Sequence, residues 1–287
     1  MVTEKTKKFW QTMMGIDRRV IFIFTFVALS IPMFIKIDMK IPVSPEVETL
    51  FESLESLSDG STVLVSLDYD PSSEPELQPM AETFFQYALR RNFKVVVIGL
   101  WPQGPIQAER AREVAETKEG KQYEYGVDYI NLGFQAGNEL VIQRMGSSIP
   151  DVFPRDYFGH SIKESEYPIM QGVRNFSNID YVFNLSAGYP GTVEWVLFAA
   201  DRFSVNLGAG NTAVQAPMVY PYLGKQLKGV LGGMKGGAEF EILTNLKGRA
   251  TSYMVGQTFA HAVIVFFIII ANIAYFATRE EKKGGIL

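Results

Sequence analysis

The chain of 287 residues contains no cysteine and only two histidines, His160 and His261. The absence of cysteine excludes disulfides, thiolate nucleophiles and metal sites with cysteine ligands. Because His261 lies in an apolar segment, a catalytic triad elsewhere in the chain would have to use His160. His160 lies in a polar stretch, residues 146–177, that we interpret as a long surface loop with a functional or docking role. We therefore expect no metal and no cofactor, and we interpret His160 as a solvent-exposed loop residue rather than a catalytic one.

The chain also lacks an excess of basic residues. Its formal net charge is −4, and residues 41–252 carry 17 Lys and Arg against 26 Asp and Glu. Proteins that bind nucleic acid need a clustered basic surface to neutralise phosphates. Nucleic acid is therefore excluded as a partner.

Two apolar segments without Asp, Glu, Lys or Arg lie near the two ends of the chain, at residues 20–35 and 253–278. A helix that crosses the hydrocarbon of a bilayer needs about 20 residues that are mainly apolar. The residues after the first segment offer no small-residue cleavage site, so we interpret it as an anchor rather than a signal peptide. The sequence predicts one transmembrane helix at each end and a lipid bilayer as partner.

Basic residues near the predicted spans indicate the orientation of the chain. Five Lys and Arg precede the first span and three follow the second, and such residues favour the cytoplasmic side. We predict a plasma or inner membrane protein with both termini in the cytoplasm and an extracytoplasmic α/β domain. The predicted parts are cytoplasmic residues 1–19, a span at 20–35, the domain at 36–252, a span at 253–278 and a cytoplasmic tail at 279–287.

The second predicted span contains small and polar residues that favour helix packing. Ser252, Gly256 and Ala260 recur every four residues, and His261 follows. Small residues let helix backbones approach closely, and intramembrane polar groups bond to neighbouring helices. We predict packing through these four residues, either against the first span or against other copies in a homo-oligomer or other membrane proteins.

Short apolar runs alternate with helical patterns between the two spans. The predicted strands are residues 62–67, 93–100, 128–132, 180–185 and 203–207. Nearly continuous apolar runs are typical of strands buried on both faces, and the alternation indicates crossover connections. We predict a doubly wound α/β domain with a mostly parallel sheet of about five strands.

In such sheets, ligands bind at the carboxyl ends of the strands. The polar, aromatic and glycine residues at those predicted ends are the candidate ligand-binding residues. They are Asp68, Asp70, Trp101, Asn131, Asn184, Ser186, Asn206, Gly208, Gly210 and Asn211.

Asp68 and Asp70 form a D-x-D pair after the first predicted strand. One interpretation is a Mg²⁺ site, because hard cations prefer carboxylate oxygens. The other is that Asp70 caps the turn into the next helix. We favour the turn, because no second acidic cluster completes a metal site.

Two glycine-rich stretches allow further interpretations. Residues 208–213 match the G-x-G-x-x-A pattern of a dinucleotide loop, although no acidic residue follows at the required distance. Residues 229–237 could cradle an anion, but they lack the Ser or Thr of a phosphate-binding loop. We interpret the first stretch as a turn between strand and helix, and the second as a membrane-proximal segment in which glycine permits close packing or bends.

These patterns leave three hypotheses for the function. The first is a non-enzymatic subunit or scaffold of a membrane protein complex, which the two predicted anchors favour. The second is small-molecule binding or sensing at the strand ends. The third is a Mg-dependent enzyme that uses Asp68 and Asp70.

Overall fold

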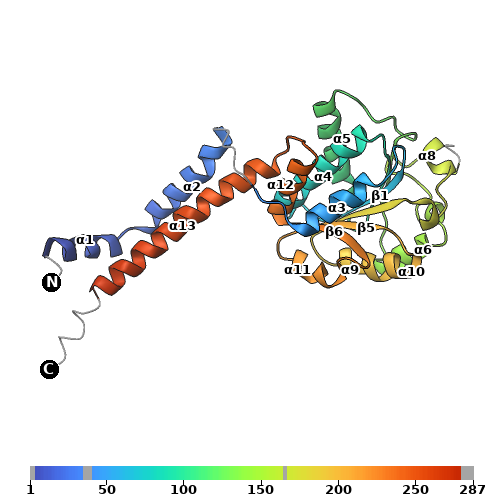
Figure 1. Ribbon diagram of the computed structural model, residues 1–287. Coiled ribbons are helices and arrows are strands. Elements are labelled where there is room, and N and C mark those ends of the chain that lie inside the picture. The colour runs from blue at the N-terminus through green and yellow to red at the C-terminus, as the bar shows by residue number, and fades with distance from the viewer. Residues whose placement is uncertain (1–3, 35–40, 164–166, 279–287) are drawn as a thin grey trace. The chain divides into compact units, whose positions relative to one another are not determined.

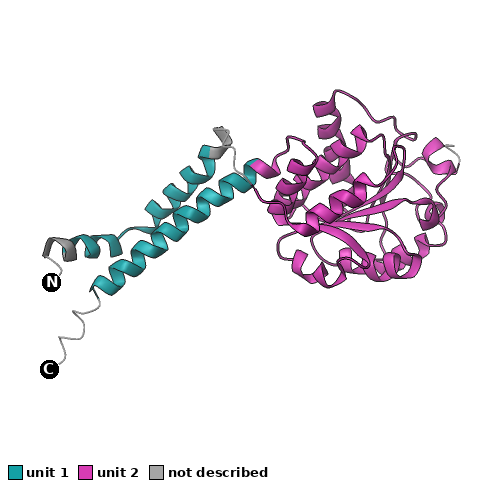
Figure 2. Ribbon diagram, viewed as in Figure 1, with its two compact units in different colours: residues 1–40, 252–287 teal, residues 41–251 magenta. Residues whose placement is uncertain are grey.

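The computed structural model describes residues 4–34, 41–163 and 167–278. Two compact units divide the chain (Figure 2): Met1–Lys40 with Ser252–Leu287, and Ile41–Thr251. The first unit consists of helices, and the second is a sheet covered by helices on both faces (Figure 1). In chain order, the elements are α1 (Glu4–Met14), α2 (Arg18–Phe34), α3 (Pro45–Glu55), β1 (Thr62–Asp68), α4 (Glu74–Arg90), β2 (Lys94–Gly99), α5 (Gly104–Glu119), β3 (Tyr129–Phe134), α6 (Glu139–Met145), α7 (Ile149–Val152), α8 (Pro168–Gln171), η1 (Phe176–Asn178), β4 (Tyr181–Ser186), α9 (Thr192–Trp195), η2 (Val196–Ala200), α10 (Asp201–Phe203), β5 (Leu207–Asn211), α11 (Ala216–Val219), η3 (Tyr220–Tyr222), β6 (Leu227–Gly232), α12 (Gly233–Leu243) and α13 (Ala250–Thr278).

In the helical unit, α13 is long and apolar enough to cross a membrane. The other apolar helix, α2, has 17 residues and begins with Arg18 and Arg19. Its apolar part within the described residues, 20–34, extends only about 22 Å at 1.5 Å per residue, less than the ~30 Å of bilayer hydrocarbon. The predicted span at 20–35 ends beyond the described residues. One candidate span is therefore shown, and a second is not.

Helices α2 and α13 pack against each other within this unit. The rings of Phe24 and Phe267 meet edge to face, with their centroids 5.8 Å apart. A Cβ atom at Gly256 would lie 3.4 Å from the carbonyl oxygen of Leu29. Such an approach of a helix to a neighbouring backbone is typical of small residues.

The second unit contains a six-stranded, all-parallel sheet in the order β3-β2-β1-β4-β5-β6. This is the strand order of a Rossmann-like fold, in which three strands run outward on each side of the junction between β1 and β4. Alternate residues of β1 enter the two hydrophobic cores: Val63 and Val65 pack with α3, α4, α5 and α12, whereas Leu64 packs with α6 to α9. The predicted α/β class and doubly wound, mostly parallel sheet are confirmed, and the sheet has one strand more than expected.

Two strands in the second half of the sheet differ from the sequence predictions. The fifth strand occupies Leu207–Asn211 rather than residues 203–207. A helical segment continues to Phe203, and Ser204 ends it in the left-handed conformation with φ 55°. The sixth strand, β6, lies where the sequence indicated a membrane-proximal, glycine-rich segment. Its glycines interrupt the apolar run, and Gly229 is needed because a Cβ there would lie 2.4 Å from the carbonyl oxygen of Glu46 in α3.

A buried glutamate of α12 caps the first turn of α13. The carboxylate of Glu241 accepts hydrogen bonds from the backbone N–H groups of Ala250 (2.7 Å) and Thr251 (2.9 Å) and from the Thr251 hydroxyl (2.6 Å). These N–H groups have no partner within the helix, and negative charge at this end also interacts favourably with the helix dipole. Desolvation raises the pKa of Glu241 despite these bonds.

We expect Glu241→Ala to lower the free energy of unfolding of the Ile41–Thr251 unit by about 1–2 kcal/mol, because it removes a cap and leaves buried donors unpaired. Urea unfolding of the full chain in detergent, followed by circular dichroism, measures this change. Glu48→Ala, at an exposed position on α3, is the control and should stay within about 0.5 kcal/mol of the unsubstituted chain. Equal stabilities of the two variants would refute the capping role.

Candidate functional site

The candidate site lies between β1 and β4, where the order of the strands reverses. Connections leave the sheet in opposite directions at this switch point, and in open α/β sheets the crevice there is the usual ligand site. The last residues of the two strands, Asp68 and Ser186, are register partners. Two residues predicted from the sequence therefore lie side by side at the position that the fold favours for binding.

The carboxylate of Asp68 is fully buried and surrounded by hydrogen-bond donors. Its strand contributes the hydroxyl of Ser66 (2.9 and 3.0 Å). Three other segments contribute the backbone N–H of Leu100 (2.7 Å), the side-chain amide of Asn184 (2.6 Å) and the indole N–H of Trp195 (3.3 Å). Desolvation raises the pKa of Asp68 to about 7, although these hydrogen bonds oppose the rise.

The network continues across the sheet to β5. The hydroxyl of Thr192 donates to Oδ1 of Asn184 (2.6 Å) and accepts from Nδ2 of Asn211 (2.9 Å). The same amide of Asn211 lies 3.3 Å from the carbonyl oxygen of Ser186. All four residues are buried, so their polar groups bond to one another rather than to solvent at the switch point.

Loops cover the carboxyl ends of β1 and β4. The indole N–H of Trp101 donates to the carbonyl oxygen of Pro190 (2.9 Å), and a Cβ at Gly188 would lie 3.6 Å from the Trp101 ring. The Ser186 hydroxyl donates to the carbonyl oxygen of Gly188 (3.0 Å). A Cβ at Gly191 would lie only 1.9 Å from that hydroxyl, so glycine is required there.

The D-x-D pair does not converge on one site. Asp70 accepts hydrogen bonds from the backbone N–H (3.0 Å) and the hydroxyl (2.6 Å) of Ser72, which is an Asx turn leading into α4. Asp68 instead faces the buried network. Among the described residues, no group of three or more His, Cys, Asp or Glu side chains could hold a metal ion.

Three other predicted site residues are held in contacts within the fold and do not face the Asp68 network. Asn131 bonds to the buried Glu109 of α5 (2.8 Å). Gly208 and Gly210 lie inside β5, where a Cβ would meet the Tyr181 hydroxyl at 2.3 Å or Leu185 at 2.4 Å. Residues 208–211 therefore belong to the strand, and the turn expected at 208–213 comes after it, at residues 213–215.

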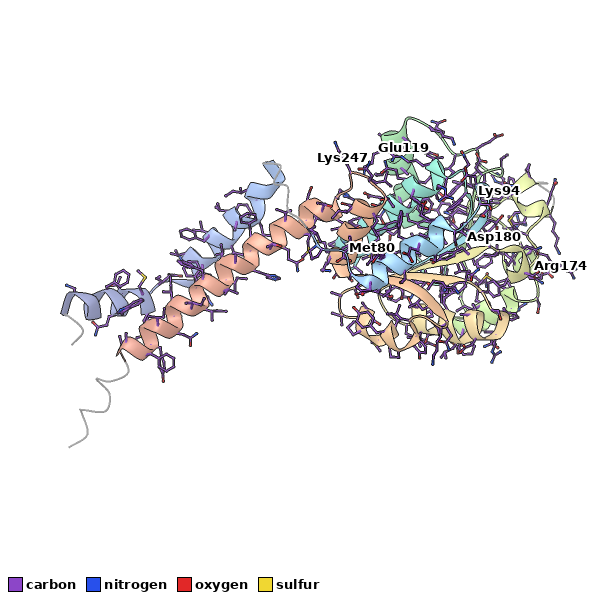
Figure 3. All side chains as sticks on the ribbon, viewed as in Figure 1. Met80, Lys94, Glu119, Arg174, Asp180 and Lys247 are labelled. Atoms are coloured by element: carbon purple, nitrogen blue, oxygen red, sulfur yellow. The ribbon has the colours of Figure 1, made fainter. Side chains whose placement is uncertain are left out.

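The structure corrects the predicted position of Asn206. It precedes β5, and its side-chain amide donates to the carbonyl oxygen of Asp180 (3.2 Å), directly before β4. Asp180 and Lys94, both labelled in Figure 3, mark this amino-terminal edge of the sheet. Asn206 therefore lies at the opposite edge from Asp68 and Asn211.

Sequence reasoning did not identify three members of the network. Ser66 could have been found from the period of two, because it lies on the same face of β1 as Asp68. Thr192 and Trp195 lie three residues apart in α9, a spacing that places two side chains on one face. Whether these two side chains reach the Asp68 network depends on the direction in which α9 leaves β4. That direction cannot be predicted from the sequence pattern.

Comparisons with known protein families, with curated proteins and with solved structures found no match. The class that this geometry defines is a Rossmann-like α/β unit in a chain with a candidate membrane helix.

We expect Asp68→Asn to change the pH dependence of stability. The folded chain keeps the Asp68 proton to about pH 7, whereas the unfolded chain loses it near 3.8. The folded state therefore binds more protons between these values, and this residue lowers stability as the pH rises through that window, by on the order of 4 kcal/mol. Urea unfolding from pH 4 to 7.5, followed by tryptophan fluorescence, should show this decline in the unsubstituted chain and a flatter profile in the variant. Parallel profiles would refute the assignment.

Proposed function

We propose that the chain is a membrane-anchored, non-enzymatic subunit or scaffold of a membrane protein complex. In this proposal, residues 20–35 and 253–278 both span the bilayer, and the acidic α/β domain lies outside the cytoplasm. The length and apolarity of α13 support the second span. The basic residues before the first segment and after the second support the orientation.

The observation that carries the non-enzymatic assignment is the buried hydrogen-bond network at the switch point. Four protein donors surround the Asp68 carboxylate. A ligand that entered this crevice would have to replace hydrogen bonds made in a buried environment, where unpaired polar groups are costly. The arrangement favours a polar network that fixes the junction of β1 and β4 over a binding site.

The Mg-dependent alternative receives no support from this arrangement. Asp68 and Asp70 already serve as acceptors in two different settings, a buried network and an exposed turn. A cation would need several oxygen ligands directed at one point. The D-x-D pair does not supply them.

Small-molecule binding is the second candidate, and a cavity of about 310 Å³ at the carboxyl end of β3 favours it. Phe134, Gln135, Arg155 and Tyr157 are among its lining residues. Asp156, also in the lining, fixes the loop: its carboxylate accepts from the hydroxyls of Tyr125 and Tyr167 and from the backbone of His160.

The cavity combines aromatic side chains with one guanidinium, which suits a small anionic ligand with an apolar part. The nearby His160 has a side chain that is 62% exposed, and its Nδ1 lies 3.2 Å from Asp156. This agrees with its interpretation as a loop residue at the surface.

We expect the full chain, purified in mild detergent, to be larger than the 32.2 kDa single chain after the detergent contribution is subtracted. A subunit or scaffold remains associated with copies of itself or with other membrane proteins. Light scattering combined with size exclusion, and mass spectrometry of the same fraction, measure this. A lone monomer with no stoichiometric membrane protein would contradict the proposal.

For the second candidate, thermal unfolding should be measured against a panel of small carboxylates and phosphates. A compound that binds the cavity at 100 times its Kd would stabilise the folded state by about 2.7 kcal/mol, which is a rise of roughly 5 °C in Tm. Arg155→Gln should remove the rise, and Arg174→Gln, at another exposed arginine (Figure 3), should keep it. No rise with any compound would exclude this class of ligand.

A further inference from the structure

The long helix α13 has two chemically different faces within the helical unit. One face packs on α2 and contains small or aromatic residues. Gly256 lies against Leu29, and Phe267 lies against Phe24. Ala260 and Ala274 are buried, with 6% and 0% exposure.

The polar side chains of the predicted span lie on the other side of the helix. At about 100° per residue, His261 and Asn272 lie about 140° and 160° around the axis from Gly256. Both side chains are exposed in the structure. Gln257, one turn before His261, is partly exposed. Together, Gln257, His261 and Asn272 form the polar face of α13.

These polar groups have few partners within the part of the chain that is described. The imidazole of His261 and the amide of Gln257 make no hydrogen bond there. The Asn272 amide donates one hydrogen bond to the carbonyl oxygen of Ile268 (2.8 Å) and leaves its own Oδ1 without a donor. Each group therefore retains hydrogen-bonding capacity that lipid tails do not satisfy.

The spacing of the two residues places at least one of them inside the hydrocarbon. His261 and Asn272 are 11 positions apart in α13, a rise of about 16 Å along the helix. The hydrocarbon is about 30 Å thick. If either residue lies at one interface, the other lies near the middle of the bilayer, where polar side chains face protein rather than lipid.

We propose that the polar face of α13 binds the same face of a second copy of this chain. The inference rests on the proposed membrane anchoring. Two copies inserted with the same orientation pack their α13 helices in parallel, and a two-fold axis then brings each residue against its own counterpart. A group at such an axis must be able to bond to an identical group. An amide and a neutral imidazole can do so, because each carries both a hydrogen-bond donor and an acceptor.

The alternative occupant, a helix of a different protein, would not need self-complementary groups. The polar face contains no Asp, Glu, Lys or Arg. Charged side chains would repel their own counterparts at a two-fold axis, so their absence is consistent with homotypic contact.

Cross-linking of the full chain in phosphatidylcholine vesicles tests the contact directly. The chain has no cysteine, so a single introduced thiol reports on its own position. Ile268→Cys, on the polar side between His261 and Asn272, should give a disulfide-linked dimer under mild oxidation. Val263→Cys, about 20° from Gly256 and therefore on the α2 side, is the matched control and should remain a monomer.

Energy transfer between labelled copies in the same vesicles measures the strength of the contact. His261→Leu combined with Asn272→Leu should weaken self-association about tenfold, because interhelical hydrogen bonds in membranes contribute on the order of 1–2 kcal/mol. Asn272→Gln keeps the amide and should retain most of the association. Ile269→Leu, at an exposed apolar position, should have no effect. Both substitutions to leucine increase apolarity, so they favour insertion of the helix.

The outcomes separate this inference from the proposed function. Absence of the Ile268→Cys dimer, or equal association of the leucine variants and the unsubstituted chain, overturns the homotypic contact. If the chain then still purifies in stoichiometric complex with another membrane protein, the proposed subunit role stands without it. If it purifies as a lone monomer, both proposals fail.

Discussion

The burial of the Asp68 carboxylate is the constraint on which the centre of the globular unit depends. A carboxyl group that leaves water is costly to ionise, so it needs hydrogen-bond donors, and burial raises its pKa even when they are present. Here the partners come from β1, the turn after β2, strand β4 and helix α9. Each segment must reach its place for the group to be satisfied, so this residue links β1 and the turn after β2 to β4 and α9.

This constraint also bears on how the fold is used. Dinucleotide-binding members of this architecture leave the switch point open and use glycine turns to bring phosphate close to the backbone. In this chain, Asn184, Thr192 and Asn211 are buried there and hydrogen-bond to one another. The required glycines serve other contacts: Gly208 admits the Tyr181 hydroxyl and Gly210 admits Leu185. Hydrogen bonds among buried side chains at the switch point favour rigidity of this junction.

The sequence predicted strands β1 to β4 better than β5 and β6, for a physical reason. Strands β1, β2 and β4 are buried on both faces by large apolar side chains, so their runs are continuous and easily found. In β5 and β6, neighbouring residues pack so closely against the backbone that several positions must be glycine. These glycines interrupt the apolar run by which a buried strand is recognised in a sequence. The position of Asn206 was predicted wrongly for the same reason. The predicted strand at 203–207 is four residues too early, so a residue expected at the carboxyl end of β5 lies before its amino end. Of the site, sequence alone gave Asp68, Asn184, Ser186 and Asn211, but not their partners in α9.

Helix α12 connects this rigid sheet to both segments through which the chain enters and leaves the globular unit. Glu239 accepts a hydrogen bond from the Ser44 hydroxyl (2.5 Å) at the start of α3, and also contacts Lys235. Two residues further on, Glu241 caps the first turn of α13. Both carboxylates are buried, so the two entry points are fixed to one helix that follows directly from β6. A displacement of either segment would have to break charged hydrogen bonds in a buried environment, and these are among the strongest polar contacts that a protein makes. The two ends of the globular unit are thereby tied to the same helix, which limits how far one can move relative to the other.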